Sequence, residues 1–239
     1  MGTNSALITR RVLLGLLGMV MAGTLFIAGV PSSAAQAPGQ APAPGGPPPA
    51  GRGPAPTPPT AGAHLTIIDG SSASYRVQEQ LAGIDFPSDA VGTTPAVSGA
   101  LVINPDGSID TAQSKLTIDL RQLKSDQDMR DGFIQKRTLE TDKFPEAVFV
   151  PKRIKGLPTM IPTQGQTGFE LTGDMTIHGM TSEVTFKGIA TFGRESTVDG
   201  RATTSFTFAT FGLTKPTLAR LLSVDDNIKL EVVFKFKRT

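Results

Sequence analysis

The sequence has no cysteine and no tryptophan, and it has only one tyrosine and two histidines. Without cysteine, the chain can form no disulfide, thiol nucleophile, cysteine metal ligand or cysteine-linked lipid anchor. The shortage of tryptophan and tyrosine disfavours a carbohydrate-stacking surface. Gly-rich phosphate loops, serine nucleophile elbows and histidine–carboxylate zinc motifs are also missing. We therefore expect no enzyme activity and no catalytic residue, metal or cofactor.

The chain also lacks an excess of positive charge over most of its length. Three arginines precede His64 without any acidic residue, so residues 64–239 carry 20 basic and 21 acidic side chains, a net charge of −1. The net charge of +2 for the whole chain thus arises outside this part. We expect no nucleic-acid partner, because binding to phosphate backbones needs a basic surface.

The first 30 residues combine a basic pair with a long apolar run. Arg10 and Arg11 precede residues 12–30, which are uncharged and would span about 28 Å as a helix. This length is close to the hydrocarbon thickness of a bilayer, so we interpret residues 1–30 as a signal peptide or a membrane anchor. Small side chains at residues 32–35 favour cleavage, but length alone does not decide. Both alternatives predict an extracytoplasmic protein that is periplasmic, secreted or membrane-anchored.

Residues 31–63 are poor in charge and in large apolar side chains. They hold 11 of the 19 prolines and a single charged residue, Arg52. Such a composition cannot build a packed core and favours an extended chain. We interpret this segment as a Pro/Ala/Gly-rich linker, which is a membrane tether if residues 1–30 are kept. The folding unit is then residues 64–239, a length that suits one core.

Apolar side chains recur at alternate positions through the folding unit, which is the pattern of strands with one buried face. The pattern predicts about eight strands, at residues 75–81, 97–103, 116–120, 146–153, 169–178, 183–192, 202–211 and 228–237. One helix is expected after the third strand, with Ser125 as its N-cap and with Met129 and Phe133 on one face. Tight turns are expected at residues 104–107, 178–179 and 199–200.

One-sided strands in this number must bury a common apolar face, either between two sheets or inside one closed sheet. An eight-stranded barrel has an interior that side chains just fill or that holds one small ligand. Gly173 bears on this choice, because it interrupts the inward face between Leu171 and Met175. Either it leaves room for a ligand, or it permits a bend or close approach of the backbone.

Three parts of residues 64–239 carry a resemblance to a known family. They are residues 128–133 with 143–149, residues 171–181, and residues 206–212 with 224–230. In this order they resemble the YceI-like family of exported, lipocalin-like barrels that bind polyisoprenoids and other lipid-like amphiphiles. The resemblance implies an all-β fold, an eight-stranded antiparallel barrel with one short helix, extracytoplasmic location and an elongated apolar pocket.

The resemblance and the alternation together predict a carrier that holds a long-chain amphiphile, such as a polyisoprenoid, a quinone or a fatty acid derivative, inside the barrel. The expected ligand contacts are the inward side chains of the later strands, although plain core is the other interpretation of many of them. These residues are Phe169, Leu171, Gly173, Met175, Ile177, Val184, Phe186, Phe206, Phe208, Leu230, Val232 and Phe234. The rival hypothesis is a packed barrel on a stalk that serves as a cell-surface interaction module without ligand.

Two polar features have a functional and a plain interpretation. His178 would need partner residues to act as a base or metal ligand, and we expect it instead to satisfy a turn or to meet a ligand head group. Lys152, Arg153 and Lys155 either bind a phosphate or anionic head group or form a solvated strand end, and the second is favoured.

Overall fold

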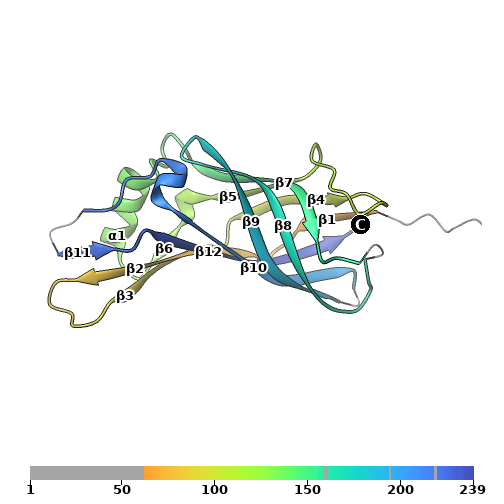
Figure 1. The fold of residues 1–239 in the computed structure, drawn as a ribbon, viewed down its shortest axis with the longest axis horizontal. Coiled ribbons are helices and arrows are strands. Elements are labelled where there is room, and N and C mark those ends of the chain that lie inside the picture. The colour runs from red at the N-terminus through yellow and green to blue at the C-terminus, as the bar shows by residue number, and fades with distance from the viewer. Residues whose placement is uncertain (1–61, 159–160, 194, 218–219) are drawn as a thin grey trace, which may run out of the picture. The chain divides into compact units, whose positions relative to one another are not determined.

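The computed structural model describes residues 62–158, 161–193, 195–217 and 220–239, which form one antiparallel sheet that closes on itself (Figure 1). The predictions for residues 1–30 and almost all of 31–63 concern residues outside this part. No helix within the described ranges has the length and apolar character needed to cross a bilayer. The elements are β1 Ala63–Ile67, β2 Ser72–Leu81, β3 Ser88–Thr94, β4 Val97–Ile103, β5 Lys115–Asp119, η1 Leu120–Gln122, β6 Lys124–Ser125, α1 Asp128–Phe133, η2 Ile134–Thr138, β7 Glu146–Lys155, β8 Gly165–Ile177, β9 Met180–Phe192, β10 Thr197–Thr207, η3 Phe208–Phe211, β11 Leu221–Val224 and β12 Asn227–Arg238.

Eight long strands, which we call staves, make the wall of the barrel. Each of the first three is broken into two segments: β1 with β2, β3 with β4, and β5 with β6. At one end the order is β1, β4, β5, β7, β8, β9, β10 and β12, and β12 pairs back with β1 to close the ring. Toward the other end, β12 pairs instead with β2, which pairs with β3, and β3 pairs with β6. This second end also carries α1 and β11 (Figure 1). We call the first the closed end and the second the mouth.

The expected eight-stranded antiparallel barrel with one short helix is confirmed, and each of the eight predicted strands falls on a different stave. The alternation missed β1, β3 and the short strands β6 and β11. β1 is only five residues long, and β3 contains just two apolar side chains, Ala90 and Val91. The second stave breaks where Pro95 supplies no amide hydrogen for a ladder.

Two of the three expected turns are confirmed. The Gly107 N–H donates to the Asn104 carbonyl, and His178 and Gly179 join β8 to β9 with φ values of 53° and 76°. The expected turn at residues 199–200 is wrong, because both residues lie within β10. A β-carbon at Gly200 would overlap the carbonyl oxygen of Ile189 and the ring of Phe234. The glycine therefore marks a close approach between strands and not a turn.

The helix is present, but its expected N-cap is wrong. Ser125 ends the short strand β6, and Gln127 is the N-cap of α1. The Ser125 N–H donates to the Asp131 carboxylate at 2.8 Å, and its hydroxyl accepts from the Gln127 N–H at 3.3 Å, so Ser125 builds the turn before the helix. Met129 and Phe133 were expected to share one face of the helix. That face is not buried, because Met129 is 82% exposed.

Candidate ligand cavity

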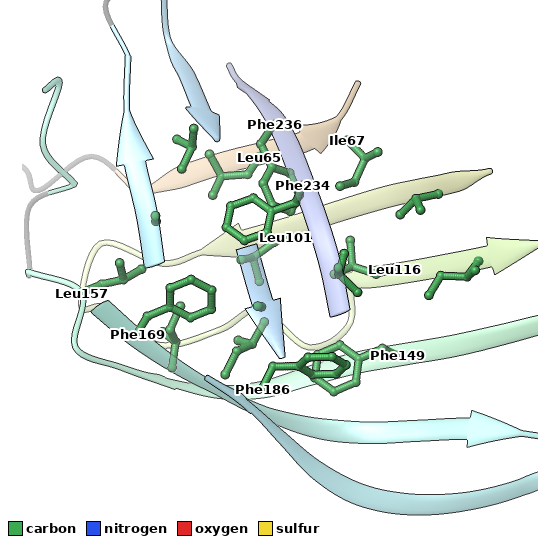
Figure 2. A pocket seen from close by; sticks show the side chains of 18 of the residues that line it. Leu65, Ile67, Leu101, Leu116, Phe149, Leu157, Phe169, Phe186, Phe234 and Phe236 are labelled. Carbon is green, nitrogen blue, oxygen red and sulfur yellow. The ribbon is translucent and has the colours of Figure 1, made fainter. Parts of the chain in front are cut away.

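The closed end of the barrel encloses a narrow chamber of about 90 Å³. Every side chain that lines it is aliphatic, aromatic or methionine, because the inward positions of the staves carry no polar residue here. Figure 2 shows the labelled residues Leu65, Ile67, Leu101, Leu116, Phe149, Leu157, Phe169, Phe186, Phe234 and Phe236 around this space. We call it the inner chamber.

A second and much larger space of about 850 Å³ lies on the mouth side, which we call the outer chamber. Its walls come from β2, β3, β8 and β12 and from the irregular segments that cover the mouth: η1, α1, η2, η3 and β11. The volume lies within the range of small-molecule sites.

The two chambers adjoin at four residues that line both spaces, Ile118, Ala147, Met175 and Val232, which we call the neck. Met175 is almost fully buried, with 1% of its surface exposed. Thioether side chains are flexible and adapt to irregular contacts. The interior therefore holds two adjoining chambers, a small one that is wholly apolar and a large one that is mainly apolar, separated by the side chains of the neck.

The structure brings ten of the twelve expected ligand contacts to the wall of this cavity. Phe169, Leu171, Phe186 and Phe234 line the inner chamber. The neck includes Met175 and Val232, and the outer chamber has Ile177, Phe206, Phe208 and Leu230.

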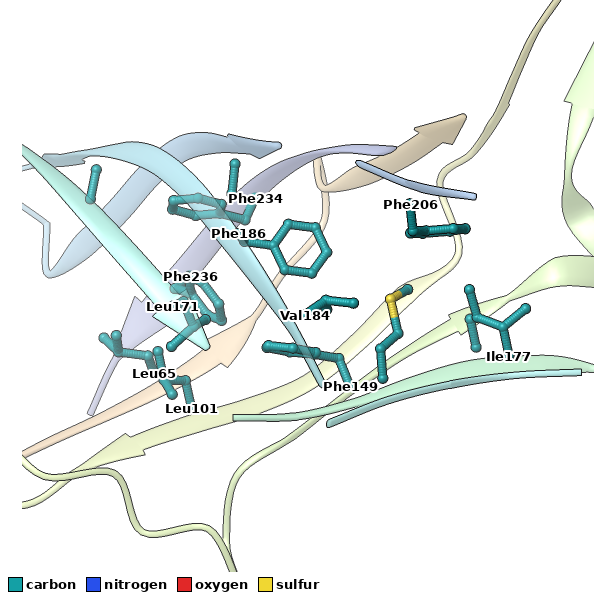
Figure 3. Packing of buried hydrophobic residues seen from close by; sticks show 14 of the residues in the cluster. Leu65, Leu101, Phe149, Leu171, Ile177, Val184, Phe186, Phe206, Phe234 and Phe236 are labelled. Atoms are coloured by element: carbon teal, nitrogen blue, oxygen red, sulfur yellow. The ribbon is translucent and has the colours of Figure 1, made fainter. Parts of the chain in front are cut away.

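Gly173 and Val184 are the two expected contacts that line neither chamber. They face each other across the β8–β9 ladder. Val184 is packed in the buried cluster beside Phe149 and Phe186 (Figure 3). At Gly173, a β-carbon would lie 2.8 Å from the Phe149 ring and would overlap the Val150 carbonyl oxygen. The close-approach interpretation of this glycine is therefore the one that fits the geometry.

Several cavity residues were not in the sequence-based set. Phe149 and Phe236 occupy inward positions of β7 and β12, and the alternation alone would have identified them. Glu79 and Arg130 in the outer chamber carry no such signal, because they are charged and lie 51 residues apart.

A nearly enclosed ion pair joins α1 to β2 at the wall of the outer chamber. The Arg130 guanidinium donates to the Glu79 carboxylate at 2.6 Å, and the two side chains are only 13% and 10% exposed. A second Arg130 nitrogen contacts Asp126. Because both terminal nitrogens of the guanidinium have carboxylate partners, this arginine is already neutralised and is not poised to bind a phosphate.

Tyr75, the single tyrosine, contributes its ring to the outer chamber. Its hydroxyl is buried without a hydrogen-bond partner, and burial raises the pKa of Tyr75 well above its usual range. Tyr75 therefore places a buried hydroxyl without a hydrogen-bond partner in a residue that lines the outer chamber.

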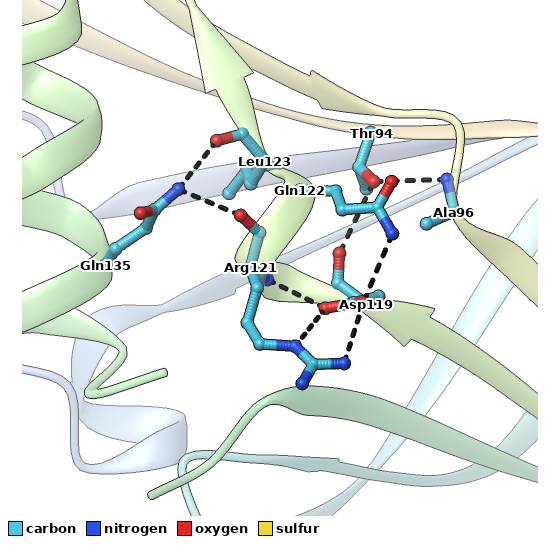
Figure 4. Close-up of polar contacts among 7 residues, drawn as sticks. All are labelled: Thr94, Ala96, Asp119, Arg121, Gln122, Leu123 and Gln135. Atoms are coloured by element: carbon cyan, nitrogen blue, oxygen red, sulfur yellow. Dashed lines mark hydrogen bonds and ion pairs between the residues drawn. The ribbon is translucent and has the colours of Figure 1, made fainter. Parts of the chain in front are cut away.

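Asp119 shapes the wall of the outer chamber from outside it (Figure 4). It is the N-cap of η1 and accepts hydrogen bonds from the Arg121 backbone and side chain at 2.9 Å and from Gln122 at 3.3 Å. The side-chain hydrogen bond from Arg121 is the main cause that lowers the pKa of Asp119 to about 2. This cap holds the turn from which Leu120 and Leu123 reach the chamber.

The remaining polar candidates lie outside the cavity. His178 is in the β8–β9 turn, with its ring edge-on to Phe144 at 4.7 Å between centroids and its Nε2 atom 3.9 Å from the Glu140 carboxylate. Lys152 forms ion pairs with Asp174 and Glu183, and Arg153 pairs with Glu183. Within the described ranges, no three His, Asp or Glu side chains gather as metal ligands would.

Comparison with known proteins places this geometry in a family. A family model described as "YceI-like domain" matches residues 68–236. A UPF0312 protein of Pseudomonas putida W619 is 34% identical over 113 residues, which cover 43% of this chain and 54% of that protein. The chain thus spans about half the length of this relative. In a UPF0312 protein of P. putida KT2440, 32% identity extends over 169 residues, 64% of this chain and 83% of that protein.

Two solved structures share the fold. The first is a polyisoprenoid binding domain from Saccharophagus degradans implicated in plant cell wall breakdown, with a TM-score of 0.58 and 14% identity over 74% of this chain and 99% of that chain. Burkholderia cenocepacia BcnA has a TM-score of 0.51 and 18% identity over 69% of this chain and 95% of its own. The family match covers well over half of the sequence and agrees with the closed barrel and its apolar interior. The chain belongs to the YceI-like family.

Proposed function

We propose that this protein binds a polyisoprenoid or a similar long-chain amphiphile, such as a quinone or a fatty acid derivative, inside its barrel. The observation that carries the proposal is the pair of adjoining chambers inside the barrel, with about 90 Å³ in the wholly apolar inner chamber and about 850 Å³ in the mainly apolar outer chamber. The solved relative named as a polyisoprenoid binding domain supports this choice of ligand class.

Apolar burial is the expected source of affinity. Each methylene transferred from water contributes about 0.8 kcal/mol, so a dozen buried carbons suffice even after the cost of association. The inner chamber suits the tail, because it has no polar lining residue, and the wider outer chamber suits the head. With Arg130 already paired, selection by chain length and bulk is expected to exceed selection by head group.

The proposal is tested by mass spectrometry of an organic extract of the purified full chain. A stoichiometric long-chain lipid supports a carrier, whereas an empty extract together with no lipid uptake supports the rival interaction module. Neighbouring valines on β12 supply a matched pair of variants, because Val232 lies in the neck and Val233 is exposed on the barrel surface.

We expect Val232→Phe to block the neck and to lower the amount of bound lipid strongly. Val233→Phe adds the same side chain outside the cavity and should retain the wild-type amount. Equal lipid content in the two variants, with both folded, would contradict binding across the neck.

We also propose that the protein acts outside the cytoplasm, with residues 1–30 as signal peptide or membrane anchor. Arg10, Arg11 and the apolar run after them support this location. Cell fractionation with N-terminal sequencing distinguishes a cleaved from an anchored chain, and full-length protein in the cytoplasm would refute both.

A further inference from the structure

Large apolar side chains are exposed around the mouth of the barrel. Ile84 and Phe86 lie in the loop between β2 and β3, Met129 lies in α1, and Leu222 lies in β11. Phe86 and Met129 are 78% and 82% exposed. All three segments occupy the same end of the barrel in Figure 1. We call these four residues the apolar rim.

The apolar rim is continuous with the cavity. Ile84 and Met129 line the outer chamber as well as being exposed, and Leu221, next to Leu222, lines it too. Single exposed apolar residues are normal on protein surfaces, but a group that converges on a cavity mouth marks an interaction site. Apolar side chains of the rim therefore lead directly into the outer chamber.

A lipid bilayer is the partner that fits this surface best. The amphiphile of the proposed function is stored in membranes, and an exit through water would cost about 0.8 kcal/mol for each exposed methylene. The loop between β2 and β3, helix α1 and strand β11 contain three acidic residues, Asp85, Asp128 and Asp131, and one basic residue, Arg130. This small acidic excess suits a zwitterionic lipid surface better than an anionic membrane or an acidic protein.

The chain before the barrel is long enough to allow this contact. β1 begins at the closed end, opposite to the apolar rim (Figure 1). The longest strands have 13 residues, or about 43 Å at 3.3 Å per residue. Residues 31–61 could extend over roughly 96 Å at 3.1 Å per residue, about twice that length. A domain tethered through residues 12–30 can thus turn its mouth toward the same membrane.

We propose that the apolar rim inserts into the interfacial region of a lipid bilayer, and that the amphiphile moves between bilayer and cavity across this contact. The choice of a bilayer as partner and the use of the contact for transfer rest on the proposed function, whereas the exposed apolar rim that makes the contact does not.

The absence of cysteine allows a direct test on the full chain. Phe86→Cys is labelled with a nitrobenzoxadiazole fluorophore and mixed with phosphatidylcholine vesicles. Ile189→Cys is the matched control, because Ile189 is 50% exposed on β9 and pairs with Gly168 and Arg201 away from the mouth. We expect a blue shift, and quenching by nitroxide lipids, for the label at residue 86 only.

Two outcomes would overturn the membrane contact. One is the same response, or no response, from both labels. The other is a blue shift at residue 86 that appears without vesicles as the protein concentration rises, since this would show that a second copy of the chain covers the rim.

A second measurement tests transfer. Phe86 and Leu222 do not line the cavity, so Phe86→Asp with Leu222→Asp should keep the lipid content found in the wild-type extract. Transfer of that lipid to acceptor vesicles should slow at least roughly tenfold, because two apolar side chains no longer enter the bilayer. Unchanged transfer would refute the role of the rim. An empty wild-type extract would instead refute the proposed function, and the fluorescence result would still decide the membrane contact.

Discussion

Gly173 shows how one missing side chain can be read in two ways. The sequence places it on the inward face of its strand, where a larger residue would fill space that a ligand needs. In the structure it instead lies against the backbone of β7, beside Val150 and the Phe149 ring, and it lines neither chamber. The space left by the missing side chain is occupied by residues of β7.

We expect Gly173→Leu to destabilise the barrel by about 1–3 kcal/mol, because the added side chain has no room without a shift of the β7 backbone. Gly168→Leu on the same strand is the control, since a β-carbon there would meet only the Gly188 carbonyl oxygen, at 3.8 Å. Urea unfolding monitored by circular dichroism measures both. Equal stability of the two variants would contradict the close-approach interpretation.

At the scale of elements, the short segments around the mouth are attached to the barrel by polar contacts that differ in burial. The Arg130–Glu79 pair joins α1 to β2 and is nearly enclosed, whereas the Arg76–Asp89 pair joins β2 to β3 in solvent, with side chains 53% and 42% exposed. Enclosed charges depend on their partners far more than solvated ones do.

We predict that Arg130→Ala lowers the free energy of unfolding by about 3 kcal/mol, because it leaves the Glu79 carboxylate enclosed without its cation. Arg76→Ala removes a pair of similar length, 2.6 Å, and should cost at most about 1 kcal/mol. Denaturant titration of the two variants provides the comparison. A cost for Arg76→Ala as large as that for Arg130→Ala would show that burial does not set the strength of this contact.

The η1 cap predicts a defined response to acid. The pKa of Asp119 is about 2 in the folded protein and near 3.8 otherwise, so its ionised form stabilises the fold above about pH 4. This contribution is lost as the pH falls toward 2. The difference in unfolding free energy between the wild type and Asp119→Asn should therefore be constant near neutral pH and shrink between about pH 4 and pH 2. A difference that stays constant down to pH 2 would contradict the cap.

Alternation of apolar residues was enough to predict which segments become staves and which of their side chains point inward, because the period of two is a property of the strand itself. It was not enough for the elements at the mouth. The 3-10 turn at Phe208–Phe211 was predicted as strand, since its phenylalanines continue the alternation while mutual hydrogen bonds between Thr207 and Thr210 turn the backbone. The Arg130–Glu79 pair depends on the contact of α1 with β2, which no local pattern encodes.

On the scale of the whole molecule, some features of the cavity follow from the alternation of apolar residues and others do not. Nine of the ten predicted lining residues lie on the inward faces of β8, β9, β10 and β12, and the tenth, Phe208, lies in η3. The two chambers and the neck arise from how the strands lie across from one another. Volume between staves is set by pairing register and by side chains from distant segments. The sequence could therefore predict an apolar interior and not its partition.

We expect residues 62–239 to fold without the preceding segment. All staves lie within this range, and Ala63, at its start, is already buried against the core. The shortened chain should give a cooperative thermal transition and a β-rich circular dichroism spectrum. A broad transition or aggregation on purification would show that residues 1–61 contribute to the fold.

The start of β1 and the last residue of the chain are neighbours, since the Thr239 N–H donates to the His64 carbonyl at 3.0 Å. A short peptide link could therefore join these two positions without a change in the order of strands around the barrel. A circular permutant that joins Thr239 to Gly62 and opens the exposed turn at Gly107 should retain all strand pairings and the cavity, because new ends are tolerated best at such turns.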